Sequence, residues 1–361
     1  MAALTENSRV REVRSPDEWN SLQAKRNHPS FLQSWQWGEL KRGFGWTPIR
    51  LAVSSPDGDC GGGLQVLLKT RRILPFLPPV GIAYMPRGPF GEATQRQSRE
   101  LIDAAVERAR RAGASFIRAE PAAECSPAAL AAMREAGFKP APQYVQIRST
   151  GYVALDRSED EILASFKPKT RYNVRLATRR GVDIRVADKE ADLDSFYRLT
   201  VVTGERDGFA VHGPAYYQAV WDELGESRRL FIASVNGEDV GALFAVICGD
   251  MATYLYGASS NRYRNTMSSY LLQWEAMLWA KQSGCATYDF WGMADPETEN
   301  DPMAGVHRFK QGFRPRLVQH AGTLDLPLRP LTYLAITRIG LPMRTQLQAL
   351  LSRRRGPASA V

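Results

Sequence analysis

Features that mark specialised classes of protein are rare in this sequence. The 361 residues include only four cysteines, and none of them stands in a C-x-x-C pair, which argues against a disulfide scaffold and against a zinc site. No uninterrupted apolar stretch has the roughly 20 residues that a membrane-spanning helix needs. The polar and charged N-terminus, residues 1–12, lacks the pattern of a signal peptide. We therefore expect a protein of the reducing cytoplasm, without a bound metal.

What the sequence does contain is an ordinary globular composition on a chain long enough for two domains. Hydrophobic residues make up 44% of the chain and charged residues 24%, and a chain of this length usually divides into more than one core. The net charge is +9, and the pI is about 9.5. A positive surplus favours polyanionic partners such as nucleic acid, diphosphates or an anionic membrane surface, but it also serves solubility alone.

Secondary-structure signals recur in the same order in both halves of the chain. The first half contains a capped helix (30–41), a hairpin (48–53 with 63–68) and a strand that ends at residue 84. A second helix (99–112) and a last strand (115–119) follow. The second half repeats the hairpin, strand, helix and strand over residues 230–235 with 240–247, 252–256, 270–281 and 287–291. A strand and a basic helix within residues 152–185 precede them. This repetition predicts an internal duplication of two α/β units with mixed sheets.

The order of elements is that of the N-acetyltransferase (GNAT) fold, in which users of acetyl-CoA place a glycine-rich turn between the central strand and the next helix. Backbone amides of that turn hold the pyrophosphate. The corresponding segment of the second half, 260–267, has no glycine, and in the first half, 87–92, Pro89 removes an amide. The sequence thus predicts two tandem GNAT-like domains that use an acyl donor other than CoA.

Six short strings resemble signatures of the FemABX peptidyltransferases, and they occur in the order of that family. They are Gln33-Ser-Trp-Gln-Trp-Gly-Glu-Leu-Lys41, Pro86-Arg-Gly-Pro89, Lys169-Thr-Arg-Tyr-Asn-Val-Arg175, Tyr254-Leu-Tyr-Gly-Ala-Ser259, Tyr288-Asp-Phe-Trp-Gly292 and Arg308-Phe-Lys-Gln-Gly-Phe313. The resemblance covers roughly residues 30–325 and implies a compact member of the family, without a helical hairpin inserted in the second domain. It also implies a first domain in residues 1–150, completed by residues 317–361, and a second domain in residues 151–316.

The same resemblance implies an aminoacyltransferase that moves an amino acid from aminoacyl-tRNA to the side-chain amine of a peptidoglycan precursor, which builds the bridge between stem peptides. The implied partners are aminoacyl-tRNA as donor and a nucleotide- or lipid-linked muropeptide as acceptor, with no cofactor, and we expect a monomer. Two alternatives stay open. A Fem-like enzyme of natural-product synthesis would aminoacylate a small-molecule amine, and a non-catalytic GNAT-like module would only bind a nucleotide-linked ligand.

The reaction needs alignment, a neutral attacking amine and stabilisation of the oxyanion, but no covalent intermediate. Neither a G-x-S-x-G string nor a Cys–His pattern is present. The resemblance implies a functional lysine at Lys310, next to Phe309, where it would serve as an electrostatic donor to the oxyanion. The alternative for Lys310 is a solvent-facing lysine at a strand edge. Glu92 is the candidate for holding or deprotonating the acceptor ammonium.

A second group of residues matches positions at which the family contacts the precursor. Lys41 is the candidate for a phosphate contact, although a lysine at a helix C-terminus also suits the helix dipole. His212 stands where some relatives carry a phosphate-binding arginine, and histidine is the poorer anion ligand at neutral pH. Tyr254 and Tyr256 are expected on one face of their strand, because they are two residues apart. The other candidates for substrate binding are Tyr216, Tyr256, Arg87 and Trp37, of which Trp37 also suits a role in the core.

Two segments are strongly basic. The first is the candidate for binding the tRNA backbone, and its cations are Lys167, Lys169, Arg171, Arg175, Arg179 and Arg180. The second segment, residues 326–361, contains six arginines and no acidic residue. Its interleaved apolar residues suit loose attachment to the inner face of an anionic membrane, as two short helices broken at Pro342. A solvated helix face is the alternative for both segments.

Overall fold

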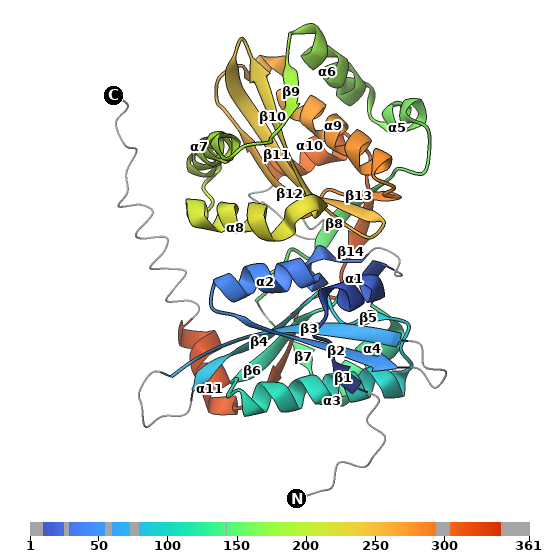
Figure 1. Cartoon of the computed structure of the whole chain (residues 1–361), viewed down its shortest axis with the longest axis vertical. Coiled ribbons are helices and arrows are strands. Elements are labelled where there is room, and N and C mark those ends of the chain that lie inside the picture. The colour runs from blue at the N-terminus through green and yellow to red at the C-terminus, as the bar shows by residue number, and fades with distance from the viewer. Residues whose placement is uncertain are drawn as a thin grey trace, which may run out of the picture.

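A computed structural model describes most of the chain, over residues 10–24, 29–54, 60–72, 79–123, 125–141, 143–293 and 304–340. The polar N-terminal segment up to residue 9 and most of the predicted membrane-binding tail, including the break at Pro342, lie outside the described residues. Within these ranges the chain forms two mixed β-sheets with helices packed on them, stacked along the long axis of the molecule (Figure 1).

The first sheet has the strand order β1-β2-β3-β4-β6-β15-β7, with β5 paired to β3. Its strands are β1 (Val10–Glu12), β2 (Thr47–Ser54), β3 (Cys60–Arg71), β4 (Val80–Pro86), β5 (Phe90–Gly91), β6 (Phe116–Glu120), β7 (Lys139–Pro140) and β15 (Leu324–Pro327). Helices α1 (Pro16–Ala24) and α2 (Trp35–Gly43) lie on the side facing the second sheet, and α3 (Gln95–Arg111) covers the opposite face (Figure 1). Helix α4 (Pro127–Glu135) packs beside α3, and α11 (Pro330–Ala335) follows β15.

The second sheet has the order β14-β8-β13-β12-β11-β10-β9. Its strands are β8 (Ser149–Ala154), β9 (Asp183–Val186), β10 (Arg228–Val235), β11 (Glu238–Cys248), β12 (Met251–Ser259), β13 (Thr287–Asp289) and β14 (Arg316–Gln319). One face packs against α5 (Glu159–Ser165), α6 (Pro168–Arg179), α9 (Ser268–Gln282) and α10 (Ala304–Gln311), and the other against α7 (Glu190–Asp207) and α8 (Pro214–Leu224). The core on the α7–α8 face includes Trp37 and Leu40 of α2, so the two halves share buried side chains.

The two sheets repeat one topology, as the order of the sequence signals predicts. In the first, β2, β3 and β4 pair antiparallel in succession, and β6 then lies parallel to β4. In the second, β10, β11 and β12 pair antiparallel, and β13 lies parallel to β12. The next strand of each sheet follows the repeated unit of the other sheet along the chain. β8, which comes after the first unit, pairs with β13 of the second sheet, and β15, which comes after the second unit, pairs with β6 of the first. The halves therefore exchange one strand each.

The exchange requires the chain to cross between the sheets twice, once before β8 and once between β14 and β15. One buried carboxylate, that of Glu120 at the end of β6, holds both crossings. It accepts hydrogen bonds from the backbone N–H groups of Val145 and Gln146 at 2.6 and 3.1 Å, and from the hydroxyl of Thr323 at 2.9 Å. Because β14 still belongs to the second sheet, the chain returns to the first sheet after Gln319. The domain boundaries near residues 150 and 316 stay predictions.

The predicted helix over residues 30–41 is divided into two pieces. Ser30 precedes a single 3-10 turn, Phe31–Gln33, and Ser34 then has an extended backbone with φ −66° and ψ 157°. The hydroxyl of Ser34 accepts a hydrogen bond from the N–H of Trp37 at 3.1 Å, so the helix proper begins after Ser34. Two serines four residues apart thus provide two caps, where the sequence pattern indicates one.

Candidate functional site

Lys310 lies near the end of α10 and is buried, with 5% of its surface exposed. Its ammonium donates a hydrogen bond to the carbonyl of Gly292 at 2.6 Å and lies 5.4 Å from the centre of the Tyr254 ring. The adjacent Phe309 packs its ring against Tyr270 with 4.9 Å between ring centres. The alternative expectation for Lys310, a solvent-facing lysine at a strand edge, is wrong, because the residue lies on a helix and its side chain is buried.

Asp289, the last residue of β13, is a buried acid that interacts electrostatically with Lys310. Its carboxylate accepts hydrogen bonds from the hydroxyl of Thr150 and, at 2.8 Å, from the backbone N–H of Trp291. Burial raises the pKa of Asp289 to about 6, and burial lowers the pKa of Lys310 to about 8, against the attraction of the Asp289 carboxylate. At pH 7 both groups are charged. We call Lys310, Asp289, Thr150, Trp291 and Gly292 the Lys310 cluster.

Sequence reasoning missed Asp289 as a site residue, although it stands inside the Tyr288-Asp-Phe-Trp-Gly292 string. A carboxylate between large apolar side chains at the end of a strand was the available signal, because a buried acid needs partners. Its neighbours Tyr288, Phe290 and Trp291 are all aromatic, and the string served only to support the family resemblance.

Arg87 approaches the Lys310 cluster from the first sheet. It follows β4, is 5% exposed, and donates a hydrogen bond to the carbonyl of Ile147 at 2.8 Å. Its guanidinium carbon lies 5.7 Å from the centre of the Trp291 ring. Burial lowers the pKa of Arg87, while Glu120 and Asp289 are among the groups that raise it. This predicted substrate contact is therefore enclosed between the two halves of the chain.

A second cluster forms where α2 lies against α8 (Figure 1). The ammonium of Lys41 donates a hydrogen bond to the hydroxyl of Tyr216 at 3.1 Å and lies 4.5 Å from the centre of the Trp37 ring. His212 stacks on Tyr216 with 4.0 Å between ring centres, and the hydroxyl of Tyr256 donates to that of Tyr216 at 3.5 Å. Five predicted site residues thus meet here; we call Lys41, Trp37, His212, Tyr216 and Tyr256 the Lys41 cluster.

The charge of the Lys41 cluster comes from one lysine. Burial and the neighbouring Lys41 ammonium both lower the pKa of His212, so the imidazole is neutral at pH 7. Burial raises the pKa of the Tyr256 hydroxyl well above its usual value, with Tyr216 adding to the effect. A single ammonium among hydroxyl and aromatic groups can bind one phosphate oxygen, while the hydroxyls serve as further donors.

The expectation that Tyr254 and Tyr256 share one strand face is wrong. A β-bulge interrupts the pairing of β11 with β12, so that Phe244 opposes Tyr256 and Ala245 opposes Tyr254, with Leu255 left over. The extra residue turns the two tyrosines to opposite faces of the sheet. Tyr254 packs on the α9 side beside Lys310, and Tyr256 on the α8 side beside Tyr216. The bulge thus places Tyr254 beside the Lys310 cluster and Tyr256 in the Lys41 cluster.

Aromatic rings join the two clusters. The ring of Phe31 lies 5.2 Å from that of Trp37 and 5.2 Å from that of Trp291, measured between centres. Trp37 belongs to the Lys41 cluster and Trp291 to the Lys310 cluster. The two clusters are therefore connected through the Phe31 ring, which contacts one residue of each.

Two groups of predicted residues lie apart from these clusters. Glu92 follows β5 and its side chain is exposed, so it is outside both clusters in the described part of the chain. Among the cations of α6 and its two capping residues, Arg171 donates to the carbonyls of Ala164 and Phe166, and Arg180 donates to the carbonyl of Asn265, so both contact the rest of the fold. The exposed members are Lys167, Lys169, Arg175, Arg179 and Arg180.

The described part of the basic tail packs on the first sheet. Tyr333 of α11 donates its hydroxyl to Asp325 at 3.1 Å, and its ring lies 5.2 Å from that of Phe116. In the ranges that the structure describes, no helix combines the length and the apolar character that crossing a bilayer requires. Membrane attachment through residues 326–361 stays a prediction, because Arg344 and the three arginines 353–355 lie outside the described residues.

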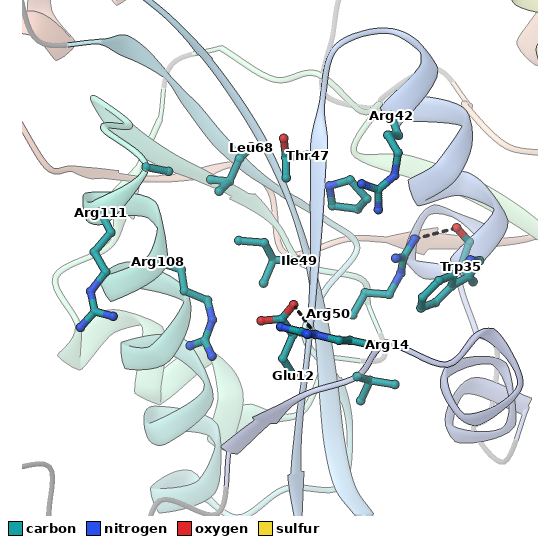
Figure 2. A pocket seen from close by; sticks show the side chains of 13 residues that line it. Glu12, Arg14, Trp35, Arg42, Thr47, Ile49, Arg50, Leu68, Arg108 and Arg111 are labelled. Atoms are coloured by element: carbon teal, nitrogen blue, oxygen red, sulfur yellow. Dashed lines mark hydrogen bonds and ion pairs between the residues drawn. The ribbon is translucent and has the colours of Figure 1, made fainter.

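A cavity of about 750 Å³ on the first half is lined by arginines (Figure 2), and its lining includes no member of either cluster. The arginines that line it are Arg14, Arg42, Arg50, Arg108 and Arg111, around a floor that includes Ile49 and Leu68. Four of the five guanidiniums already pair with carboxylates, those of Glu12, Glu39 and Glu107, at 2.6–3.5 Å. An anionic ligand would have to displace these acids, so the cavity is not our candidate site.

Comparison with known proteins identifies relatives over nearly the whole chain. The FemAB family model matches residues 132–240 and 237–340. The lipid II:glycine glycyltransferase of Staphylococcus aureus (strain USA300) is 27% identical over 409 aligned residues, which cover 91% of this chain and 96% of that protein. The same enzyme from the bovine strain RF122 gives the same identity and coverage.

Solved structures share the fold. The crystal structure of FemX has a TM-score of 0.80 at 24% identity, over 91% of this chain and 100% of that chain. A tandem GNAT protein from the clavulanic acid biosynthesis pathway has a TM-score of 0.55 at 15% identity, over 88% of this chain and 98% of that chain. The prediction of two tandem GNAT-like domains with mixed sheets is confirmed.

Proposed function

Because the chain belongs to the FemAB family, we propose that it is an aminoacyltransferase that moves an amino acid from aminoacyl-tRNA to the side-chain amine of a peptidoglycan precursor. The relatives named above act as lipid II:glycine glycyltransferases, which supports bridge formation on a muropeptide as the type of reaction. The observation that carries the proposal is the buried Lys310 ammonium, which donates to the carbonyl of Gly292 and interacts electrostatically with Asp289.

The proposed reaction is attack of an amine on an activated ester. The amine forms a bond to the carbonyl carbon, the carbonyl oxygen becomes an oxyanion, and the bond to the ribose oxygen then breaks as that oxygen takes up a proton. Lys310 stabilises the oxyanion, since a buried ammonium in a region of low dielectric interacts strongly with a developing negative charge. The two halves supply alignment of donor and acceptor, which can be worth about 7–11 kcal/mol.

The Lys41 cluster fits the phosphate-bearing part of the acceptor. Its ammonium and the hydroxyls of Tyr216 and Tyr256 can share the oxygens of a phosphate group, and the Trp37 ring lies beside the ammonium. The exposed cations of α6 fit the tRNA backbone, where each would add a salt-dependent contact. Glu92 is proposed only as a contact to the peptide part of the acceptor, since its exposed side chain lies outside both clusters.

The donor is tested by comparing aminoacyl-tRNA with acetyl-CoA. We expect product to form from aminoacyl-tRNA and to disappear when the tRNA is digested with RNase before the reaction, because the amino acid is activated only as the tRNA ester. Acetyl-CoA should give no product, since segment 260–267 has no glycine and Pro89 removes a backbone amide from segment 87–92, so that neither provides the pyrophosphate turn. Product formation that survives RNase, or turnover with acetyl-CoA, would exclude this donor.

Replacing Lys41 with alanine is expected to raise the KM for the muropeptide about tenfold and to leave kcat nearly unchanged. Lys41 would contact the phosphate of the acceptor equally in the ground state and the transition state, so its loss removes binding without slowing chemistry. Steady-state kinetics with varied muropeptide measures both constants. Lys139→Ala, which removes an exposed lysine on β7, is the matched control, and an unchanged KM in Lys41→Ala would remove Lys41 from the acceptor site.

A further inference from the structure

We propose that Asp289 is the positioning residue for Lys310: its carboxylate is the counter-ion of the Lys310 ammonium and also shapes the turn whose carbonyl receives that ammonium. The geometry does not depend on the identity of the substrates. The consequence for turnover rests on the proposed function, in which Lys310 must carry a proton to stabilise the oxyanion.

The turn after β13 depends on Asp289. The carboxylate accepts the backbone N–H of Trp291 at 2.8 Å, and Trp291 has a left-handed backbone with φ 57°, which a large side chain rarely adopts. This conformation places the carbonyl of the next residue, Gly292, within 2.6 Å of the Lys310 ammonium. A single carboxylate thus stabilises a costly backbone conformation that creates the acceptor for Lys310.

The segment that crosses between the sheets before β8 also packs against this turn. A Cβ atom on Gly292 would meet the end of the Ile147 side chain, so a larger residue there would have to displace Ile147. On the other side Thr150 of β8 donates its hydroxyl to Asp289. The strand that the two halves exchange therefore holds the carboxylate in place, which links the position of Lys310 to the packing of the halves against each other.

Burial lowers the pKa of the Lys310 ammonium, and Asp289 is the charged group that opposes this effect. Among the described neighbours, the elements packed against the pair contribute Arg87 after β4, Tyr254 on β12 and Tyr288 on β13. Arg87 interacts with Asp289 and adds positive charge, and the two tyrosines are neutral because burial raises the pKa of each hydroxyl. Without the carboxylate, burial alone acts on the ammonium, which then loses its proton at a lower pH.

The first test measures the protonation of Lys310 without any substrate. The chain contains nine lysines, so full-length protein labelled with ¹³C at the lysine ε-carbon gives a spectrum in which Lys310→Arg identifies the Lys310 signal. We expect Asp289→Asn to lower the pKa of Lys310 from about 8 to about 7 or below. Asp239→Asn is the matched control, because Asp239 pairs with Arg185 on the second half and has no contact with Lys310.

The second test compares kcat of Asp289→Asn with that of the wild type between pH 6 and pH 8. We expect kcat to fall at least about fivefold at pH 8 with an unchanged KM, and the deficit to shrink toward pH 6, where Lys310 regains its proton in the variant. The ratio of the two rates removes the titration of the acceptor amine, which affects both proteins alike. A role confined to folding would give a ratio that does not change with pH.

The outcomes separate this proposal from the proposed function. A pKa of Lys310 that stays within a few tenths of the wild-type value in Asp289→Asn overturns the counter-ion role, whatever the activity. A lowered pKa together with a deficit that is the same at every pH overturns the link between the counter-ion and turnover. If the wild type transfers no amino acid while the pKa falls as expected, the proposed function is wrong and the role of Asp289 stands.

Discussion

Replacing Lys310 with alanine is expected to lower kcat and kcat/KM together by about 10²–10³-fold, the loss typical of one electrostatic donor to an oxyanion. The buried ammonium would meet negative charge only after the amine has attacked, so its loss affects the transition state and leaves ground-state binding intact. Burial lowers the pKa of Lys310 to about 8. The kcat of the wild type should therefore decline as the pH rises through about 8 and Lys310 loses its proton.

The measurement is steady-state transfer with saturating donor and varied muropeptide, for Lys310→Ala and for the control Lys139→Ala. Circular dichroism and thermal unfolding of both variants show whether a loss of activity reflects a loss of fold. A Lys310→Ala protein that is folded and retains kcat within about threefold of the wild type would mean that Lys310 does not act in the chemical step.

Replacing Asp325 with alanine is expected to reduce the free energy of unfolding by about 3–5 kcal/mol, because it leaves a buried guanidinium without its partner. Asp325 of β15 accepts two hydrogen bonds from Arg118 of β6, at 2.7 and 2.8 Å, and both side chains are almost fully buried. Tyr333 of α11 donates to the same carboxylate. This pair joins the returning C-terminal strand to the first sheet, so its loss tests whether that segment completes the first domain.

Denaturant unfolding of Asp325→Ala measures the change, and Asp103→Ala provides the matched control. Asp103 pairs with Arg99 at 2.9 Å on the exposed face of α3, where a broken ion pair costs less than about 1 kcal/mol. Equal small losses in the two variants would mean that the C-terminal strand contributes little to the first domain and that its boundary needs revision.

Local patterns predicted the repeated part of the fold well, for physical reasons. Alternating apolar residues around a short turn specify a hairpin without reference to the rest of the chain, and both predicted hairpins, β2–β3 and β10–β11, are present. The exchange of β8 and β15 could not be predicted in this way. The residue pattern of a strand predicts which of its faces is buried, but it does not predict which of two similar sheets the strand joins.

The site was predictable only in part, because proximity in space is not a local property. Lys41 and Tyr216 are 175 residues apart, and neither stretch of sequence indicates that a helix of the first half packs on a helix of the second. The bulge at Leu255 reversed the face of Tyr254, since one inserted residue shifts a period of two. Asp289 was missed because its importance comes from burial beside Lys310, which the sequence does not display.

The central claim is transfer of an amino acid from tRNA to the amine of a muropeptide, and one measurement tests it most directly. Purified full-length protein is incubated with tRNA charged with single radiolabelled amino acids and with either soluble nucleotide-linked or lipid-linked muropeptide. Mass spectrometry then locates the label on the acceptor. We predict label on the side-chain amine of the stem peptide, from at least one aminoacyl-tRNA and only with intact tRNA. Absence of label on both acceptors with every charged tRNA, from a folded protein, would contradict the account.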